Sequence, residues 1–297
     1  MTEQKIGQII DGKKIASEMR KKIAQEVSDI KKNFNVTPTL AVILVGNDPA
    51  SEVYVSNKEK SAHSVGMNSI QFKLASDISE NELITKIHEL NVDKKVHGIL
   101  VQLPLPAHID TRKIIHSIDP CKDVDGFHVI NVGKLSIGEI DGKNKAIIPC
   151  TPLACLHLLK EVKGKNLAGL KVTVVGSSNI VGRPLVRLLM LESCTVRIAN
   201  RSTIDLKSEC IDADAIIVAA GKPNLISADM VKKSSIIIDV GINRIQVNGV
   251  SKLVGDVDFE EVSKVAGHIT PVPGGVGPMT ISYLLKNTID CCMKLTN

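Results

Sequence analysis

Hydrophobic residues along this chain follow two patterns, short continuous runs and stripes with helical spacing. One stripe covers residues 13–30, where apolar residues recur every three or four positions, and another covers 280–295. Runs and stripes alternate along most of the chain, which predicts an α/β protein with parallel sheets. The runs that predict buried strands are residues 39–46, 69–75, 96–106, 170–175, 195–200, 214–221 and 235–244.

The stretch 170–189 is the centre of this organisation. Its apolar run stops at Gly176, and apolar residues at helical spacing resume at Val181. A strand, a short loop and a helix in this order form an anion site, because Gly176 lets the backbone approach a pyrophosphate and the helix start presents N–H groups. The usual dinucleotide fingerprint is G-x-G-x-x-G. Here Gly176 and Gly182 are six residues apart, and Ser178 stands where the second glycine is expected, so the match is loose. A plain strand, turn and helix stays open as the alternative.

Two domains are expected from the length of 297 residues and from the order of elements. A glycine-containing segment at 138–142 precedes Thr151, a predicted helix cap, and Pro152. We therefore predict a boundary near residue 147. The last helix is long enough to return to the first domain. The prediction is one domain of residues 1–146 plus 279–297 and a second, doubly wound domain of residues 147–278.

Composition excludes several classes of function. Apolar runs are too short to span a membrane, and the N-terminus lacks the basic and apolar regions of a secretory signal, which predicts a cytoplasmic protein. Seven cysteines without C-x-x-C spacing indicate reduced thiols, and the eight histidines form no metal-binding motif, so no metal is expected. A net charge of only +5 with 2% aromatic residues argues against nucleic-acid binding.

Four polar side chains are predicted to converge at one sheet edge. Tyr54 and Lys58 are four residues apart on a helix that follows the strand 39–46, while Gln102 ends a neighbouring strand. Ligands of open α/β sheets bind at the carboxyl ends of the strands, and the polar loop that carries Asp125 suits the same place. Each candidate also has a simpler interpretation. Tyr54 and Lys58 can be a solvated surface pair, Gln102 can satisfy backbone groups, and Asp125 can shape a turn.

The end of the strand 195–200 favours NADP over NAD as the dinucleotide. An NAD-selecting protein places an acid here for the ribose hydroxyl, whereas this chain has Asn200, Arg201 and Ser202. The Arg201 guanidinium suits a 2′-phosphate, with Ser202 assisting. A solvated loop arginine is the alternative.

Six motifs, in order, resemble the bifunctional methylenetetrahydrofolate dehydrogenase/cyclohydrolase family over nearly the whole chain. They are YVSNK (54–58), VQLPLP (101–106), KDVDGFH (122–128), VVGSSNIVGRP (174–184), IDVGINR (238–244) and PVPGGVGPMT (271–280). The resemblance implies a folate-binding catalytic domain at 1–146 plus 279–297 and a Rossmann-like NADP-binding domain at 147–278. It also implies oxidation of 5,10-methylenetetrahydrofolate to the methenyl compound and hydrolysis to 10-formyltetrahydrofolate, in one shared cleft.

The resemblance also implies a role for each candidate residue. Lys58 is the central catalytic group, Gln102 its tuning partner, Tyr54 the surface for folate, and Asp125 the acceptor for the pterin. Ser177 and Asn200 depart from some members, which carry arginine and histidine there. The further folate-contact positions are Val101, Leu103, Pro273, Gly274 and Gly275, and the cofactor positions are Gly176, Ser177, Ser178, Arg201, Ser202 and Ile242.

Two other functions remain open, a dehydrogenase that has lost hydrolysis and a non-catalytic folate-binding module. The intact Lys58 and Gln102 argue against both. The resemblance further implies a homodimer joined through the nucleotide domains, acting in folate one-carbon metabolism.

Overall fold

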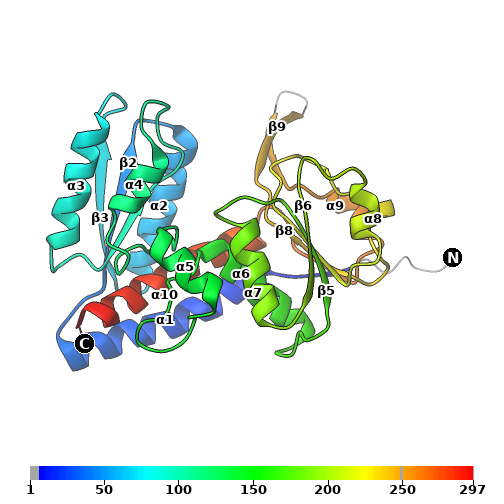
Figure 1. The fold of residues 1–297 in the computed structure, drawn as a ribbon, viewed down its shortest axis with the longest axis horizontal. Helices are drawn as coiled ribbons and strands as arrows, with labels where there is room; N and C mark the ends of the chain where they lie inside the picture. Colours follow the sequence, from blue (N-terminus) through cyan, green and yellow to red (C-terminus); the bar gives the residue numbers. More distant parts are fainter. Residues whose placement is uncertain (1–6, 248–249, 297) are drawn as a thin grey trace. The chain divides into compact units, whose positions relative to one another are not determined.

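The computed structural model describes residues 7–247 and 250–296 (Figure 1). Residues 1–6, which belong to the N-terminal stretch considered above for a signal, lie outside the described residues, as does Asn297 of the predicted first domain. Contacts divide the chain into two compact units. The six-stranded unit comprises Met1–Ala16 and Thr151–Thr280, and the three-stranded unit comprises Ser17–Cys150 and Ile281–Asn297.

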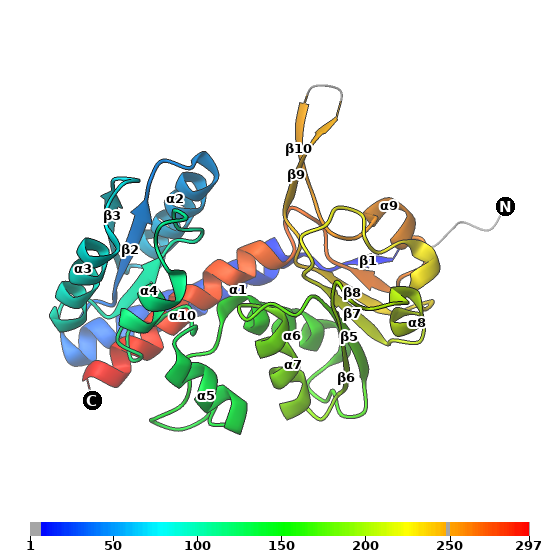
Figure 2. The same cartoon turned by 45° about the horizontal axis from the view of Figure 1, so that its top comes forward.

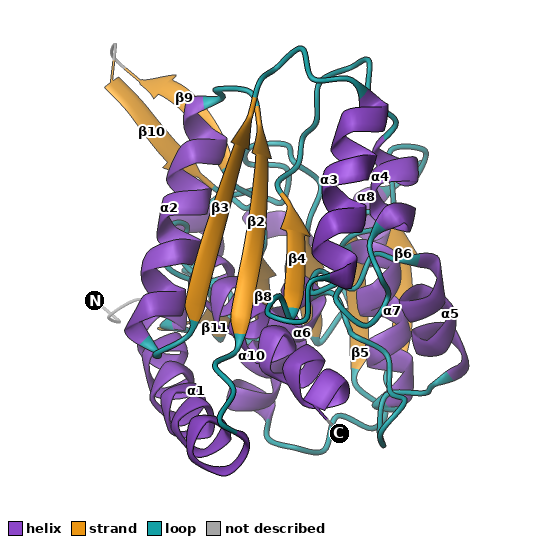
Figure 3. Cartoon of the chain, turned by 90° about the vertical axis from the view of Figure 1, so that its left-hand side faces the viewer, coloured by secondary structure: helices purple, strands orange, loops and turns teal. Residues whose placement is uncertain are grey.

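The three-stranded unit is built on a parallel sheet in the order β3-β2-β4 (Figure 3). Its central strand β2 (Thr39–Val45) lies between β3 (Asn68–Leu74) and β4 (Gly98–Val101), and every β2 residue is buried. Because side chains alternate along a strand, Ala41 and Ile43 contact one apolar cluster, and Val42 contacts another. A continuous hydrophobic run is therefore what a strand covered on both faces requires.

Helices cover both faces of this sheet. One cluster joins the sheet to α3 (Glu80–Val92) and α4 (Thr111–Ser117), and the other joins it to α2 (Pro49–Ser64) and α10 (Val276–Thr296). Helix α3 begins with a capping box, since the side chains of Ser79 and Glu82 each accept the other's backbone N–H. The remaining helices of the unit are α1 (Gly12–Phe34), which packs on α2 and α10, and α5 (Val129–Ile137).

The six-stranded unit contains a parallel sheet in the order β1-β11-β8-β7-β5-β6 within the described residues. From β5 the chain first adds β6 at the edge and then returns to β7 on the other side of β5. The strand order therefore reverses between β5 and β7, which makes this the switch point of a doubly wound fold and confirms the predicted class. The strands are β1 (Gln8–Ile9), β5 (Lys171–Val175), β6 (Thr195–Ala199), β7 (Ala215–Val218), β8 (Ile236–Asp239) and β11 (His268–Ile269).

Helices flank this sheet, and a β-hairpin leaves it. In Figures 1 and 2, α6 (Cys150–Lys163) and α7 (Gly182–Leu191) lie on the side opposite α8 (Leu206–Cys210) and α9 (Phe259–Val262). A short 3₁₀ helix, η1 (Ala228–Met230), packs with the latter pair. The strands β9 (Asn243–Val247) and β10 (Val250–Val254) pair with each other as a separate two-stranded ribbon that extends away from the sheet (Figure 2).

Several predicted boundaries differ from the structure. The strand predicted at 96–106 ends at Val101, since prolines follow at 104 and 106. The strand predicted at 235–244 divides into β8 and β9 around Gly241. Helix α10 begins at Val276, four residues before the apolar stripe predicted at 280–295. Thr151 lies inside α6 instead of capping it, and its hydroxyl contacts the Thr280 hydroxyl at 3.2 Å.

The N-terminal residues also differ from the predicted division. Gln8 and Ile9 pair with His268 and Ile269, so residues up to Ala16 group with the six-stranded unit. A two-residue strand has too little hydrophobic pattern to be recognised along the chain. The other unit boundaries fall at 150/151 and 280/281, a few residues from those predicted at 146/147 and 278/279.

Candidate functional site

Lys58 and Gln102 meet at the carboxyl edge of the three-stranded sheet. The Lys58 Nζ donates to Gln102 Oε1 at 2.9 Å. Gln102 directly follows β4, and its backbone N–H donates to the Ile43 carbonyl at 2.9 Å. Its side-chain amide N–H donates to the Leu103 carbonyl at 2.6 Å, which leaves the amide oxygen for the lysine. The predicted convergence of these two residues is therefore present in the structure.

Asp125 completes a group of interacting charges around Lys58. Burial lowers the pKa of Lys58, and the nearby Asp125 opposes this by favouring the ammonium form. Burial raises the pKa of Asp125 to about 6, while the positive charge of Lys58 acts in the opposite direction. Both groups are thus held nearer to their neutral forms than in water. A titratable pair of this kind is suited to proton transfer near neutral pH.

The loop that carries Asp125 is held by a second carboxylate, Asp123. Asp123 is buried and accepts hydrogen bonds from the backbone N–H groups of Gly126 and His128 at 3.1 and 2.8 Å, and from Asn131 Nδ2 at 2.9 Å. Gly126 has a φ of +71°, and a Cβ there would lie 2.5 Å from the Ile147 carbonyl oxygen. The sequence analysis singled out Asp125 in this polar loop but did not predict that Asp123 holds the loop.

Cys150 and Asn287 were not among the predicted site residues. The Cys150 thiol is buried and donates to the Val124 carbonyl at 3.5 Å. Asn287, on α10, donates to that carbonyl at 2.8 Å, to the Ile148 carbonyl at 2.9 Å and to the Cys150 sulfur at 3.4 Å. Burial raises the pKa of Cys150, so the thiol is neutral and its hydrogen bonds are structural. Since 137 residues separate Asn287 from Cys150, no local pattern could reveal this contact.

The other candidates of this unit lie close in sequence to Lys58 and Gln102. Tyr54 is on α2, four residues before Lys58, and 40% of it is exposed. Val101 is the buried last residue of β4, and Leu103 is partly buried. Tyr54 thus presents an exposed ring on the helix that carries the lysine.

In the six-stranded unit, Gly176 follows β5 at the switch point of the sheet. It has a φ of +120°, and a Cβ there would lie 2.2 Å from the carbonyl oxygen of Ala219, which follows β7. A Cβ on Gly182, the first residue of α7, would lie 1.9 Å from the Gly176 carbonyl oxygen. Helix, loop and neighbouring strand therefore approach so closely that only glycine fits at both positions.

The start of α7 has the construction of an anion site. The Ser178 hydroxyl accepts the Val181 N–H at 3.1 Å and the Gly182 N–H at 3.5 Å, which orders the loop against the helix. Ser178 is exposed and Ser177 is partly buried. These residues fit the pyrophosphate of a dinucleotide, because the backbone is accessible and the helix dipole points at the loop.

Arg201 and Ser202 occupy a turn after β6. The Asn200 side-chain oxygen accepts the Ser202 N–H at 2.9 Å, and the Asn200 N–H donates to the Thr203 hydroxyl at 2.9 Å. Asn200 therefore shapes the turn that exposes Arg201. Ile242 is also exposed, between β8 and β9.

The segment Pro273–Gly275 belongs to the six-stranded unit, whereas Lys58 belongs to the three-stranded unit. Gly274 is buried with a φ of +117°, and its carbonyl accepts the Lys13 N–H at 3.1 Å. A Cβ on Gly12 would lie 1.9 Å from the Gly275 carbonyl oxygen. This segment is thus tightly held against the first turn of α1, and Pro273 is exposed.

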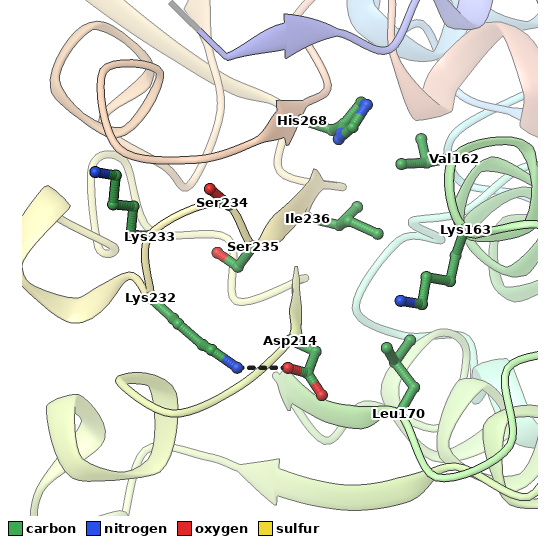
Figure 4. A pocket seen from close by; sticks show the side chains of 10 residues that line it. All are labelled: Val162, Lys163, Leu170, Asp214, Lys232, Lys233, Ser234, Ser235, Ile236 and His268. Atoms are coloured by element: carbon green, nitrogen blue, oxygen red, sulfur yellow. Dashed lines mark hydrogen bonds and ion pairs between the residues drawn. The ribbon is translucent and has the colours of Figure 1, made fainter. Parts of the chain in front are cut away.

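A hollow of about 360 Å³ opens at the other edge of the six-stranded sheet (Figure 4). Its lining residues Leu170, Asp214 and Ser235 directly precede β5, β7 and β8. This is the amino edge of the sheet, and ligands of such sheets bind at the carboxyl edge. The Lys232 ammonium in this hollow is already bonded to Asp214 at 2.6 Å. The candidate cofactor residues therefore lie elsewhere.

Two general expectations concern membranes and metals. In the described part of the chain, no helix is long and apolar enough to cross a membrane. A group of three His, Cys, Asp or Glu side chains suited to hold a metal ion is likewise not found among the described residues. The seven cysteines are free thiols, five of them buried.

Family models match most of the chain. Residues 10–125 match the model described as "Tetrahydrofolate dehydrogenase/cyclohydrolase, catalytic domain", and residues 149–296 match "Tetrahydrofolate dehydrogenase/cyclohydrolase, NAD(P)-binding domain". The first match contains Lys58, Gln102 and Asp125. The second contains Gly176 and Arg201.

Individual relatives are similar over nearly the full length. "Bifunctional protein FolD 2" of Paracoccus denitrificans is 53% identical over 288 residues, which cover 97% of this chain and 93% of the relative. The crystal structure of the bifunctional methylenetetrahydrofolate dehydrogenase/cyclohydrolase FolD of Campylobacter jejuni is 46% identical, with a TM-score of 0.91 over 96% of this chain and 98% of that one. The Trypanosoma brucei dehydrogenase-cyclohydrolase, complexed with NADP and an inhibitor, is 34% identical, with a TM-score of 0.91 over 97% and 98% of the two chains.

Proposed function

The chain belongs to the tetrahydrofolate dehydrogenase/cyclohydrolase family, and on that premise we propose that it catalyses both reactions of a bifunctional member. The first is the NADP-dependent oxidation of 5,10-methylenetetrahydrofolate to 5,10-methenyltetrahydrofolate, and the second is hydrolysis of that product to 10-formyltetrahydrofolate. The observation that carries the proposal is the 2.9 Å contact of Lys58 with Gln102 beside the raised-pKa carboxyl of Asp125.

For the hydrolytic step, Lys58 is the general base. Water must lose a proton as it attacks the methenyl carbon, and an amine accepts that proton only when it is neutral. Burial lowers the pKa of Lys58 toward this state. A cationic substrate nearby lowers it further, because like charges disfavour the ammonium. Donation of one N–H to Gln102 orients the amine, so Gln102 positions the lone pair.

The remaining residues of the three-stranded unit bind the folate. Asp125 accepts hydrogen bonds from the pterin, and its raised pKa also allows it to donate when protonated. The exposed ring of Tyr54 provides a flat surface for the pterin. Further contacts come from Val101 and Leu103 beside Gln102.

The oxidative step requires orientation more than proton transfer. When bound, NADP⁺ supplies the hydride acceptor, and the reacting carbon must be held against its ring. We assign the cofactor to the six-stranded unit, where Gly176, Ser177 and Ser178 form the loop before α7. Arg201 and Ser202 are placed on an exposed turn suited to the 2′-phosphate, and Ile242 contributes an apolar contact.

We also propose a cytoplasmic homodimer joined through the six-stranded units. A two-stranded hairpin is only marginally stable by itself, yet β9 and β10 extend from the sheet as such a hairpin (Figure 2). Packing against a second copy would cover its edges. The seven free thiols suit a reducing compartment.

The test is an assay of the purified chain with 5,10-methylenetetrahydrofolate and either NADP⁺ or NAD⁺. We expect NADPH and the methenyl compound to form together, and the methenyl absorbance then to decay as 10-formyltetrahydrofolate is produced. Accumulation of the methenyl compound without decay would favour a monofunctional dehydrogenase. Folate binding without turnover would favour a non-catalytic binding module, and faster reduction of NAD⁺ would contradict the role given to Arg201.

A further inference from the structure

A buried carboxylate, Asp256, joins two loops at the carboxyl edge of the six-stranded sheet. It is 0% exposed. Its Oδ2 accepts the backbone N–H groups of Ala220 and Gly221 at 2.7 and 2.8 Å, and its Oδ1 accepts the side-chain amide of Asn243 at 2.8 Å. The first two residues follow β7, while Asn243 begins β9. One side chain thus connects the loop after β7 with the loop after β8.

A second carboxylate, Asp239, holds Asp256 in place. Asp239 is the last residue of β8, and its Oδ1 accepts the N–H groups of Gly241 and Asp256 at 2.9 and 3.0 Å. Its Oδ2 accepts the Val257 N–H at 3.0 Å, and its own N–H donates to the Thr270 hydroxyl at 2.8 Å. Hydrogen bonds to a charged acceptor are strong and directional, so the backbone on both sides of Asp256 is firmly oriented.

The two carboxylates are closely packed against Gly241 and Gly255, and neither glycine has room for a side chain. A Cβ on Gly241 would lie 2.3 Å from the Asp256 side chain, and a Cβ on Gly255 would lie 1.8 Å from Asp239 Oδ2. Glycine at these positions lets the backbone approach the carboxylates. The arrangement therefore requires glycine at 241 and 255.

Both loops held by Asp256 border the proposed cofactor site. The first loop contains Ala219, whose carbonyl oxygen lies so close to Gly176 that no side chain fits at position 176. Ile242, one residue before Asn243, is exposed beside the same edge. A shift of the loop after β7 would move the backbone that Gly176 packs against. A shift of the loop after β8 would move Ile242.

We infer that Asp256 is a positioning residue for dinucleotide binding, which acts through the loops 219–221 and 241–243 without touching the cofactor. The inference rests on the proposed function only for the identity of the dinucleotide. Three donors meet one carboxylate, and an alanine here would leave two backbone N–H groups and one amide without this acceptor. Asparagine retains an acceptor oxygen for the backbone groups, and its N–H₂ pairs with Asn243 once that amide turns over.

The experiment compares Asp256→Ala and Asp256→Asn with the parent in equilibrium titrations with NADP⁺ alone and in both activity assays. We expect Asp256→Ala to raise the Kd for NADP⁺ and the KM for NADP⁺ by about tenfold or more, and Asp256→Asn by less than about threefold. Hydrolysis of added methenyltetrahydrofolate needs no dinucleotide. It therefore stays at the parent rate, and a parent-like denaturant unfolding curve reports that the unit that holds Asp256 is folded as well.

Asp258→Ala is the matched control. Asp258 caps α9 by accepting the Glu261 N–H at 3.3 Å. The control therefore removes an aspartate two residues from Asp256 but keeps the hydrogen bonds of Asp256 to the two loops. It should bind NADP⁺ as the parent does. An unchanged Kd in folded Asp256→Ala, or equal losses of hydrolysis and NADP⁺ binding, would overturn the inference. A parent that binds NADP⁺ without folate turnover would contradict only the proposed function, whereas a parent that binds neither NADP⁺ nor NAD⁺ would overturn both.

Discussion

At the scale of single residues, the chemistry depends on side chains whose surroundings disfavour their charged forms. Lys58 and Asp125 illustrate this, since burial lowers the pKa of the amine and raises that of the carboxyl to about 6. For Asp125, a folded-state pKa above its ordinary value means that stability is lost as pH rises from about 4 through 6. For Lys58, a lowered pKa means that stability is lost as pH falls below the ordinary lysine value. Both shifts therefore cost stability near neutral pH, which is expected of functional groups.

Replacement of the general base tests the central role of Lys58. Lys58→Met should lower hydrolysis by about 10²- to 10⁴-fold, because only water attack needs a proton acceptor and methionine retains much of the side-chain bulk. Hydride transfer should survive at a reduced rate. The measurement is methenyl decay and NADPH formation in separate assays. Lys60→Met, an exposed lysine on the same helix, serves as the control. Hydrolysis at the parent rate in folded Lys58→Met would assign the base elsewhere.

Gln102→Ala should leave Lys58 present but poorly oriented, since the amide that accepts its N–H at 2.9 Å is removed. Both activities should fall, and the pH dependence of hydrolysis should change. Steady-state rates and a pH profile provide the measurement. A pH profile identical to that of the parent would show that Gln102 does not tune the lysine.

Removal of the carboxylate should shift the pH dependence in a defined direction. The negative charge of Asp125 raises the pKa of Lys58, so Asp125→Asn should lower that pKa further. Because hydrolysis increases as Lys58 loses its proton, the midpoint of the rise should move to lower pH. The profile of kcat against pH measures this shift, and Asp141→Asn, an exposed site, is the comparison. A shift to higher pH would exclude the proposed coupling.

At the scale of elements, the critical junction is the start of α7 against the loop after β5. A Cβ on Gly182 would lie 1.9 Å from the Gly176 carbonyl oxygen, so Gly182→Ala forces the helix away from the loop. We expect a loss of about 1–3 kcal/mol in the free energy of unfolding and weaker NADP⁺ binding. Denaturant titration and nucleotide titration measure the two effects. Gly133→Ala, within α5 and with open space around it, should be neutral or slightly stabilising. Equal behaviour of the two variants would contradict the packing argument.

At the scale of the whole molecule, assembly is the main expectation. Leu253 is 36% exposed on β10, on the hairpin that we propose packs against a second copy. Light scattering should give the parent twice the 32.0 kDa chain mass, and Leu253→Lys should give the single-chain mass, because a buried unpaired charge disfavours association. Val92→Lys, at an exposed position of the three-stranded unit, should remain dimeric. A monomeric parent at micromolar concentration would refute the proposal.

The sequence by itself determined the elements whose signals are local. The continuous run at 39–46 specified a strand buried on both faces, and the apolar stripe at 13–30 specified a helix, because both patterns depend on neighbours in the chain. The motif resemblance also names Lys58, Gln102 and Asp125 as candidate site residues. Parallel strand order then implied that the lysine and the glutamine would share one edge.

Tertiary structure alone decided the contacts between distant residues. Pairing of Gln8 and Ile9 with β11, the Asn287 bonds beside Cys150, and the connection of two loops by Asp256 all join positions far apart in the chain. Hydrophobic periodicity carries no information about which distant donor meets which acceptor. Likewise, the pKa of Asp125 depends on burial and on the charge of Lys58, 67 positions earlier in the numbering. Local patterns specify elements, whereas the folded chain specifies the environment that gives each side chain its chemistry.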